Sequence, residues 1–65
     1  MDTSKEPVSL TLELIRETSG AYLVSDGSTE AWIPISQIEE EERNLLNNEI
    51  DLTIPEWLAL DKGLI

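Results

Sequence analysis

Hydrophobic and polar residues alternate strictly near the start of the chain. Aliphatic side chains take every second position and polar side chains take the positions between them: Val8, Leu10, Leu12 and Leu14 against Ser9, Thr11 and Glu13. A period of two with one polar side is typical of a strand that buries one face. We therefore expect a half-buried β-strand over residues 8–16, after a frayed terminus at residues 1–7.

Two turn signals divide the next stretch into short strands. The sequence Glu-Thr-Ser-Gly at residues 17–20 indicates a first turn. Asp26 and Gly27 predict a type I′ hairpin turn, because that turn matches the twist of the flanking strands. Strands are expected over residues 21–24 and 29–33, the second ended by a proline that lacks a ladder donor. The three strands predict an antiparallel meander.

The following segment is dominated by a charge run, Glu-Glu-Glu-Glu-Arg, at residues 39–43. We expect this run either as a short helical turn capped by Ser36 or as a solvated loop. Asn47 and Asn48 then indicate a turn. Alternation of aliphatic and acidic side chains predicts a fourth strand over residues 49–53.

The C-terminal segment carries the start and stop signals of a helix. Thr53 and Glu56 have the spacing of a capping box, and Pro55 suits the first helical turn. Gly63 occupies the position where many helices end in a left-handed residue, so that Leu64 can fold back onto the helix in a Schellman motif. We expect one short helix packed on the sheet.

These elements predict a mostly β fold, a single small α+β domain over residues 8–65. Four short antiparallel strands would form either a curled sheet or an SH3-like barrel, with one C-terminal helix. A core of this size typically supplies only about 3–5 kcal/mol of net stability. Both tryptophans are therefore expected in the core, Trp32 across from Tyr22 or Leu12, unless a partner completes it.

Composition excludes most catalytic chemistry. The 65 residues carry 14 acids against four bases, with no histidine and no cysteine, and the net charge is −10. Disulfides and the usual zinc ligands are therefore missing, and the serines and threonines have no histidine as a base. Isolated glycines do not form a phosphate loop, and the spacing of a calcium loop is absent. We expect a protein that is not an enzyme and uses no cofactor or metal.

The chain also lacks the usual signs of export or membrane insertion. No basic segment is followed by an apolar stretch, and the apolar runs are too short to span a bilayer. A soluble cytoplasmic protein without membrane partners is the expectation.

Two strings of residues carry a resemblance to known proteins. Residues 32–38 read Trp-Ile-Pro-Ile-Ser-Gln-Ile, and residues 54–65 read Ile-Pro-Glu-Trp-Leu-Ala-Leu-Asp-Lys-Gly-Leu-Ile. The chain resembles, over residues 8–65, short phage-borne and bacterial proteins of poorly known function that carry Trp-Ile-Pro-x-Ser-Gln-Ile and end in Trp-Leu-Ala-x-x-x-Gly-Leu-Ile. The resemblance implies a mobile-element setting and a small β-barrel-like fold. It supplies no mechanism. Those proteins often have lysine where this chain has Ile35, so any contact of that lysine with phosphate or a partner acid is missing here.

The uneven charge predicts a binding function. Between residues 17 and 61, eleven acids stand against one base. Rows of carboxylates can imitate a phosphate backbone, so we expect a protein partner that handles nucleic acid through a basic surface. With the mobile-element setting, this points to a DNA-mimic-like inhibitor of host defence, for example an anti-CRISPR. The expected partner-binding residues are Glu39, Glu40, Glu41, Glu42, Glu49, Asp51 and Trp57.

Two other functions stay open. The chain could be a structural or accessory module, or a homo-oligomer, in a replication or packaging assembly. It would then attach through a sheet edge and Trp57, which becomes an interface anchor if it is exposed beside Leu60 or Leu64. Direct binding of nucleic acid through Tyr22 and Trp32 is not expected, because the phosphates would repel so acidic a chain.

Overall fold

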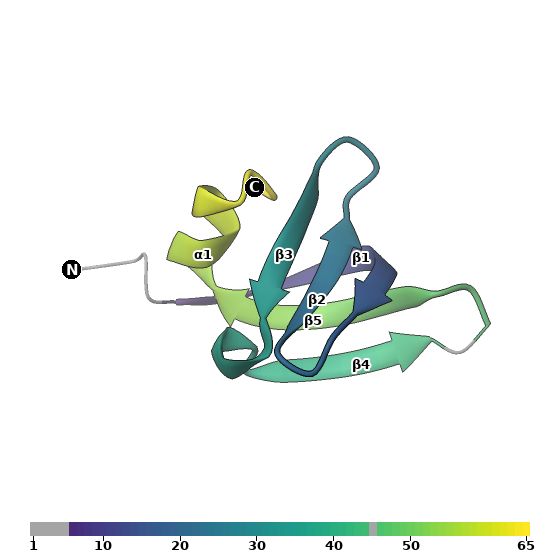
Figure 1. The fold of residues 1–65 in the computed structure, drawn as a ribbon. Helices are drawn as coiled ribbons and strands as arrows, with labels where there is room; N and C mark the ends of the chain where they lie inside the picture. The colour runs from purple at the N-terminus through teal and green to yellow at the C-terminus, as the bar shows by residue number, and fades with distance from the viewer. Residues whose placement is uncertain (1–5, 45) are drawn as a thin grey trace.

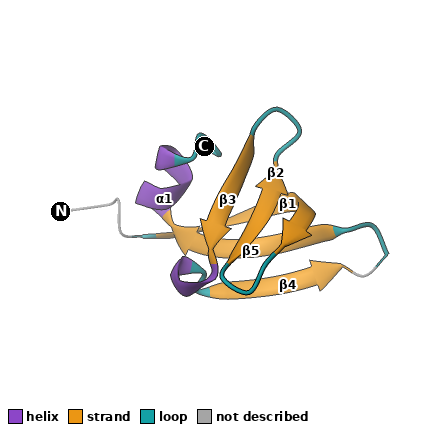
Figure 2. Cartoon of the chain, in the orientation of Figure 1, coloured by secondary structure: helices purple, strands orange, loops and turns teal. Residues whose placement is uncertain are grey.

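The fold is one antiparallel sheet and one short helix. A computed structural model describes residues 6–44 and 46–65. The elements in chain order are β1 (Pro7–Glu17), β2 (Ala21–Ser25), β3 (Glu30–Pro34), the 3₁₀ turn η2 (Ile35–Gln37), β4 (Glu40–Asn44), β5 (Glu49–Pro55) and α1 (Glu56–Asp61). The strands have the order β3-β2-β1-β5-β4, and the sheet is not closed (Figures 1 and 2).

The long strand β1 joins the two halves of the sheet. Residues 7–13 pair with β5, and the register of the later residues with β2 shifts between Leu14 and Arg16. A bulge of this kind bends a strand and increases its twist. In Figure 1, β2 and β3 run across β5 rather than along it. The predicted meander of β1, β2 and β3 is confirmed, and so is a curled, open sheet rather than a barrel.

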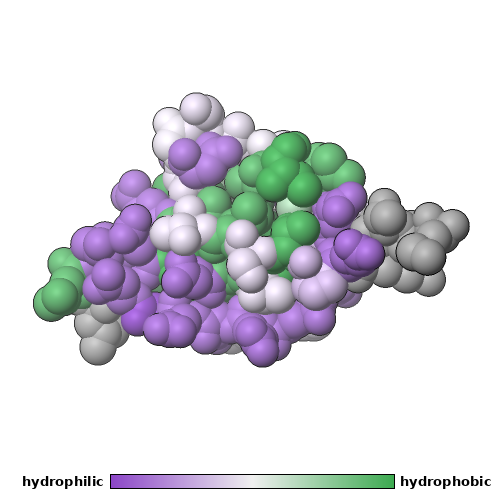
Figure 3. Space-filling view, turned by 180° about the vertical axis from the view of Figure 1, so that it is seen from behind, coloured by the Kyte–Doolittle hydropathy of each residue, from purple (hydrophilic) through white to green (hydrophobic). Residues whose placement is uncertain are grey.

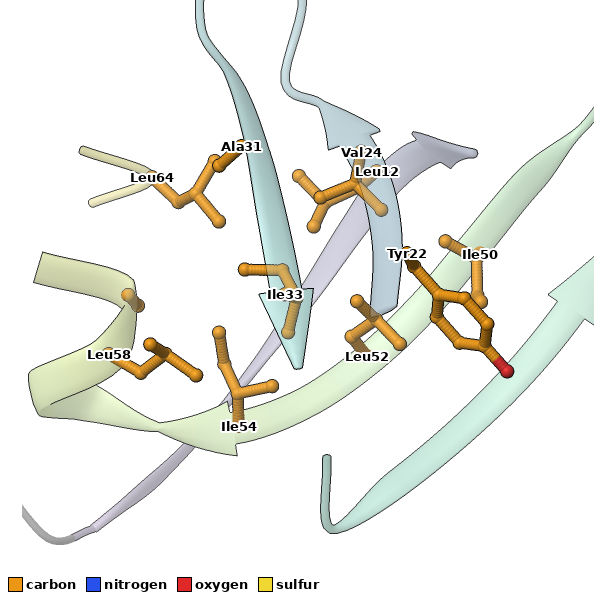
Figure 4. Packing of buried hydrophobic residues seen from close by; sticks show 11 residues of the cluster. Leu12, Tyr22, Val24, Ala31, Ile33, Ile50, Leu52, Ile54, Leu58 and Leu64 are labelled. Atoms are coloured by element: carbon orange, nitrogen blue, oxygen red, sulfur yellow. The ribbon is translucent and has the colours of Figure 1, made fainter. Parts of the chain in front are cut away.

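The core lies on the concave side of this bent sheet. Alternation along each strand directs one set of side chains inward, as the pattern at residues 8–16 and 49–53 predicts. The described residues bury no polar or charged residue. The buried cluster consists of Leu12, Tyr22, Val24, Ala31, Ile33, Ile50, Leu52, Ile54, Leu58, Ala59 and Leu64 (Figure 4).

The acidic run forms a strand, so the expectation of either a helical turn or a loop is wrong. β4 pairs along its whole length with β5, which makes five strands rather than the four predicted. Glutamate has a poor intrinsic preference for strands, but pairing with a neighbour overrides such preferences. Charged side chains also suit an edge strand, because they discourage pairing with other chains.

The Asp-Gly hairpin is present, but its turn is not type I′. That turn needs a positive φ at both central residues, and among residues 26–29 only Gly27 has one, at +100°. The carboxylate of Asp26 accepts hydrogen bonds from the N–H groups of Ser28 (2.8 Å) and Thr29 (2.7 Å). These bonds lower the pKa of Asp26, and they stabilise the turn.

The end of the helix follows the prediction. Gly63 has φ +74°, and its N–H donates to the carbonyl of Leu60 at 3.1 Å. The N–H of Leu64 donates to the carbonyl of Ala59 at 2.9 Å, which completes a Schellman motif and returns Leu64 to the core.

The start of the helix differs from the prediction. Pro55 is the N-cap and no side chain caps the helix, because Thr53 lies inside β5 with its hydroxyl 3.1 Å from that of Ser9. The N–H of Glu56 instead donates to the carbonyl of Glu6 at 2.9 Å. Of the terminus predicted to be frayed, residues 1–5 lie outside the described residues, whereas residues 6 and 7 are held by this bond and by pairing with β5.

Both tryptophans lie on the surface, so their predicted place in the core is wrong. Trp32 is 43% exposed because its neighbours in β3, Ala31 and Ile33, point inward. Its cross-strand neighbour is Leu23, rather than Tyr22 or Leu12.

The second tryptophan is displaced from the core for a different reason. Leu58 and Ala59 take the side of α1 that faces the sheet, which leaves Trp57 43% exposed. Leu60, one turn further on, is 53% exposed. Trp57 is therefore exposed beside Leu60, which is the condition under which it is expected to be an interface anchor.

Candidate functional site: the acidic face

One outer surface of the sheet carries a concentration of acids. On β1, β5 and β4, the side chains that point away from the core stand opposite one another in three rows. The rows are Ser9–Thr53–Glu40, Thr11–Asp51–Glu42 and Glu13–Glu49–Asn44. Five of these nine positions are acids and none is a base. We call this surface the acidic face.

The acidic face is hollowed along its centre. The groove has a volume of about 560 Å³, and it is lined by residues of all three strands: Ser9, Leu10, Thr11, Asp51, Thr53, Glu40, Glu41 and Glu42. A second groove, which Arg43 also lines, continues it toward Asn44 and Glu49. Figure 3 shows hydrophilic side chains in a continuous band where β4 and β5 lie.

Hydrogen bonds orient the central acids of this face. The hydroxyl of Thr11 donates to a carboxylate oxygen of Asp51 at 2.7 Å. The side-chain amide of Asn47 donates to Glu49 at 2.6 Å. Both carboxylates keep further acceptor capacity, since an ionised carboxylate offers about four lone-pair positions.

The same face holds like charges close together. Glu42 stands directly opposite Asp51, and Glu13 stands opposite Glu49. Opposed like charges on neighbouring strands are destabilising. A cationic group placed in the groove would relieve this repulsion, because none of the nine positions of the face is a base.

Four of the predicted partner-binding residues come together here. Glu40, Glu42, Glu49 and Asp51 share the acidic face. Glu13 belongs to it as well and was not predicted, because its neighbours become known only when β1 pairs with β5.

The other predicted residues lie elsewhere. Glu39 is exposed just before β4, and its N–H donates to the carbonyl of Thr53 at 2.8 Å. Glu41 is among the residues that line the groove, but its carboxylate accepts a hydrogen bond from the Tyr22 hydroxyl on the opposite side of β4 from Glu40 and Glu42, because strand side chains alternate. Trp57 lies on α1 and does not line the grooves.

Glu41 belongs to a polar network that ties β4 to the start of β2. Arg43 donates through both terminal nitrogens to the carboxylate of Glu17, at 3.1 and 2.6 Å. It also donates to the Tyr22 hydroxyl at 3.1 Å, and that hydroxyl donates to Glu41 at 3.0 Å. Figure 4 shows the hydroxyl pointing toward β4. The network therefore connects two parts of the sheet that share no ladder.

The network shifts the pKa of two of its members, Glu17 and Arg43. The guanidinium of Arg43 lowers the pKa of Glu17, and the bonds from Arg43 to Glu17 and Tyr22 raise the pKa of Arg43. The Arg43 guanidinium carbon also lies 5.2 Å from the centre of the Tyr22 ring. The Arg43 side chain is thus held toward Glu17 and Tyr22, although Arg43 also lines the second groove.

Replacement of Arg43 by methionine should return the pKa of Glu17 toward its ordinary value. A carboxyl with a lowered folded pKa adds stability above its unfolded pKa, and that stability disappears as the pH falls through the folded pKa. The variant should lack this contribution. Carboxyl NMR titration of both proteins measures the change.

Asp26 is the internal control for this titration. Its pKa is lowered by backbone N–H groups rather than by Arg43, so it should not move. An unchanged Glu17, or an equal change in Asp26, would contradict the assignment of the shift to the network.

The remaining expectations about chemistry stay predictions. Within residues 6–44 and 46–65, no three histidine, cysteine or acidic side chains are grouped to hold a metal ion. Within the same ranges, no helix has the length and apolar character needed to cross a membrane. Comparisons of the chain with protein-family models, with curated proteins and with solved structures find no match. The resemblance to short phage-borne proteins is likewise a prediction.

Proposed function

We propose that this chain is a non-catalytic binding protein that engages a basic surface of a nucleic-acid-handling protein. The observation that carries the proposal is the acidic face, where five acids and no base occupy nine outward positions. Complementary charge accelerates encounter and selects partners of opposite sign. The grooves also give the surface a shape that flexible basic side chains of a partner can enter.

Arginine is the side chain that the groove suits best. Glu42 and Asp51 stand opposite each other and are both exposed, and Asp51 accepts one hydrogen bond from Thr11. A guanidinium can donate to one or both of these carboxylates through paired N–H groups. Arginine-rich surfaces are common where proteins grip phosphate, so a phosphate-binding surface is the kind of partner that fits.

The arrangement of the acids supports imitation of a nucleic acid. Acids two positions apart on β4, and again on β5, are spaced by about 6.8 Å, and neighbouring strands lie about 4.8 Å apart. Each of the two strands therefore carries a line of negative charge along its length, and the two lines lie side by side. With the resemblance to phage-borne proteins, this leads us to propose a DNA-mimic-like inhibitor of host defence, such as an anti-CRISPR, acting in the cytoplasm.

A pull-down from nuclease-treated bacterial lysate tests the proposal. The chain should recover a basic nucleic-acid-handling protein at low salt, and the yield should fall at high salt because exposed charge pairs are screened. A bait with Glu40→Gln, Glu42→Gln and Asp51→Asn should recover much less. Equal recovery by both baits at both salt concentrations would refute charge imitation.

A second function is supported by the exposed residues of α1. Trp57 and Leu60 lie one turn apart on the helix and are 43% and 53% exposed. Exposed tryptophan is enriched at interface hot spots. A structural or accessory role in a replication or packaging assembly would use this helix. A partner whose recovery does not depend on salt, but is lost with Trp57→Ala, would favour it.

A further inference from the structure

A second outer surface of the sheet differs in character from the acidic face. On β1, β2 and β3, the outward residues Arg16, Leu23 and Trp32 stand side by side in one row. Ala21 and Pro34 form the next row. We call this surface the meander face. Leu23 is half-buried and Trp32 is 43% exposed, so these two apolar side chains form the centre of the meander face.

The backbone register brings the two apolar side chains of this row close together. The backbone N–H of Asp26 donates to the carbonyl of Thr29 at 3.1 Å, and the N–H of Ile35 donates to the carbonyl of Gly20 at 3.0 Å, across the same ladder. These bonds place Leu23 and Trp32 in a pair without hydrogen bonds, the type with the shorter separation. The row therefore presents one continuous apolar strip.

The strip ends in a positive charge. Arg16 is exposed, and it forms no salt bridge within residues 6–44 and 46–65. The row of Arg16, Leu23 and Trp32 has Ala21 and Pro34 on one side. On its other side lies a row formed by Glu13, Ser25 and Glu30. The meander face thus carries both signs of charge around an apolar centre, whereas the acidic face carries one.

We propose that a second copy of this chain docks on the meander face and forms a two-fold symmetric dimer. In a symmetric interface, the same patch must complement itself. If the axis runs along β2, Leu23 of each copy meets Leu23 of the other. Trp32 of each copy then faces Arg16 of its partner, because these residues flank Leu23 on opposite sides. A guanidinium over an indole ring is a favourable cation–π pair, and the symmetry makes two of them.

The charge pattern selects a second copy for this surface and not for the helix. On α1, Trp57 and Leu60 have the acids Glu56 and Asp61 beside them in sequence, against one base, the C-cap residue Lys62. Two such surfaces would place acid against acid. The meander face supplies its own cation, and it shares only Glu13 with the acidic face, so Glu40, Glu42, Glu49 and Asp51 of both copies stay uncovered. The dimer is therefore independent of the proposed function.

The dimer should be weak at low salt. Glu30 of each copy comes opposite Glu13 of the other at the rim, and each chain carries a net charge of −10. A contact built on one row of side chains is also small, as in transient complexes. Added salt screens the repulsion, so the dimer should tighten with salt. A complex with a basic partner should weaken over the same range.

Sedimentation equilibrium across a range of protein and salt concentrations tests the dimer. The wild-type chain should dimerise, more tightly at high salt. Trp32→Ala and Arg16→Glu should each weaken dimerisation at least ten-fold. Glu30→Gln should strengthen it, because it removes the repulsion at the rim.

Controls separate the contact from net charge and from misfolding. The pair Ser36→Glu and Gln37→Glu on exposed η2 adds the same two negative charges as Arg16→Glu, and should leave dimerisation within two-fold of wild type. Circular dichroism should show all variants folded. A wild-type chain that is monomeric in all conditions overturns the proposal, as does a control as damaging as Arg16→Glu. A monomer that loses its lysate partner with Trp32→Ala would assign the meander face to that partner.

Discussion

Replacement of Leu52 by alanine is expected to leave a large fraction of the protein molecules unfolded at 25 °C. Leu52 is fully buried in β5, between β1 and β4, and its side chain lies among the core residues of Figure 4. A buried leucine replaced by alanine loses about 2–5 kcal/mol, because transfer energy is lost and a cavity remains. A domain of this size typically has only about 3–5 kcal/mol of net stability. The loss is therefore comparable to the whole.

Leu46→Ala is the matched control for this experiment. The chemical change is the same, but Leu46 is 95% exposed in the turn between β4 and β5. Its free energy of unfolding should stay within about 0.5 kcal/mol of wild type. Urea unfolding followed by circular dichroism measures both variants. Similar losses in the two, or a Leu52→Ala protein as stable as wild type, would contradict the described core.

Removal of three charges from the acidic face is expected to lower affinity for a basic partner by about 100-fold. The variant combines Glu40→Gln, Glu42→Gln and Asp51→Asn, which preserve shape and hydrogen-bonding capacity. Close charge pairs across interfaces show coupling energies of about 1.5–7 kcal/mol, and a factor of 100 corresponds to about 2.7 kcal/mol. Calorimetric titration against the partner recovered from lysate measures the change. The slope of affinity against salt should become shallower.

A control with the same net charge distinguishes the face from the overall field. Glu6→Gln, Glu56→Gln and Asp61→Asn also remove three charges, but outside the nine positions of the acidic face. This variant should lose much less affinity, mainly through slower association. Equal losses would assign the attraction to net charge alone. A larger loss in the control would move the contact to α1.

Local patterns predicted much of the fold. Alternation at residues 8–16 and 49–53 predicted β1 and β5 with the correct buried sides. Gly63 predicted the end of the helix, because few other residues adopt its left-handed conformation. Each of these inferences depends only on residues a few positions apart in the chain, and their identities can be read directly from the sequence.

Other features depended on residues far apart in the chain. The charge run became β4 because β5 offered it a ladder, and Trp32 turned outward because Ala31 and Ile33 filled the inner side of β3. The network of Arg43 with Glu17 and Tyr22 exists only because the bent sheet brings β4 to the start of β2. No local sequence pattern shows which residues from distant parts of the chain come into contact.

The candidate site divides in the same way. Composition alone shows that the chain is strongly acidic, that eleven of its 14 acids lie between residues 17 and 61, and that it has neither histidine nor cysteine. Which acids lie together depends on the pairing of the strands. Strand register placed Glu13 beside Glu49 and Glu42 beside Asp51, while alternation turned Glu41 to the inner side. The physical reason is that a strand offers two faces, and only its pairing and the bend of the sheet decide which face meets solvent.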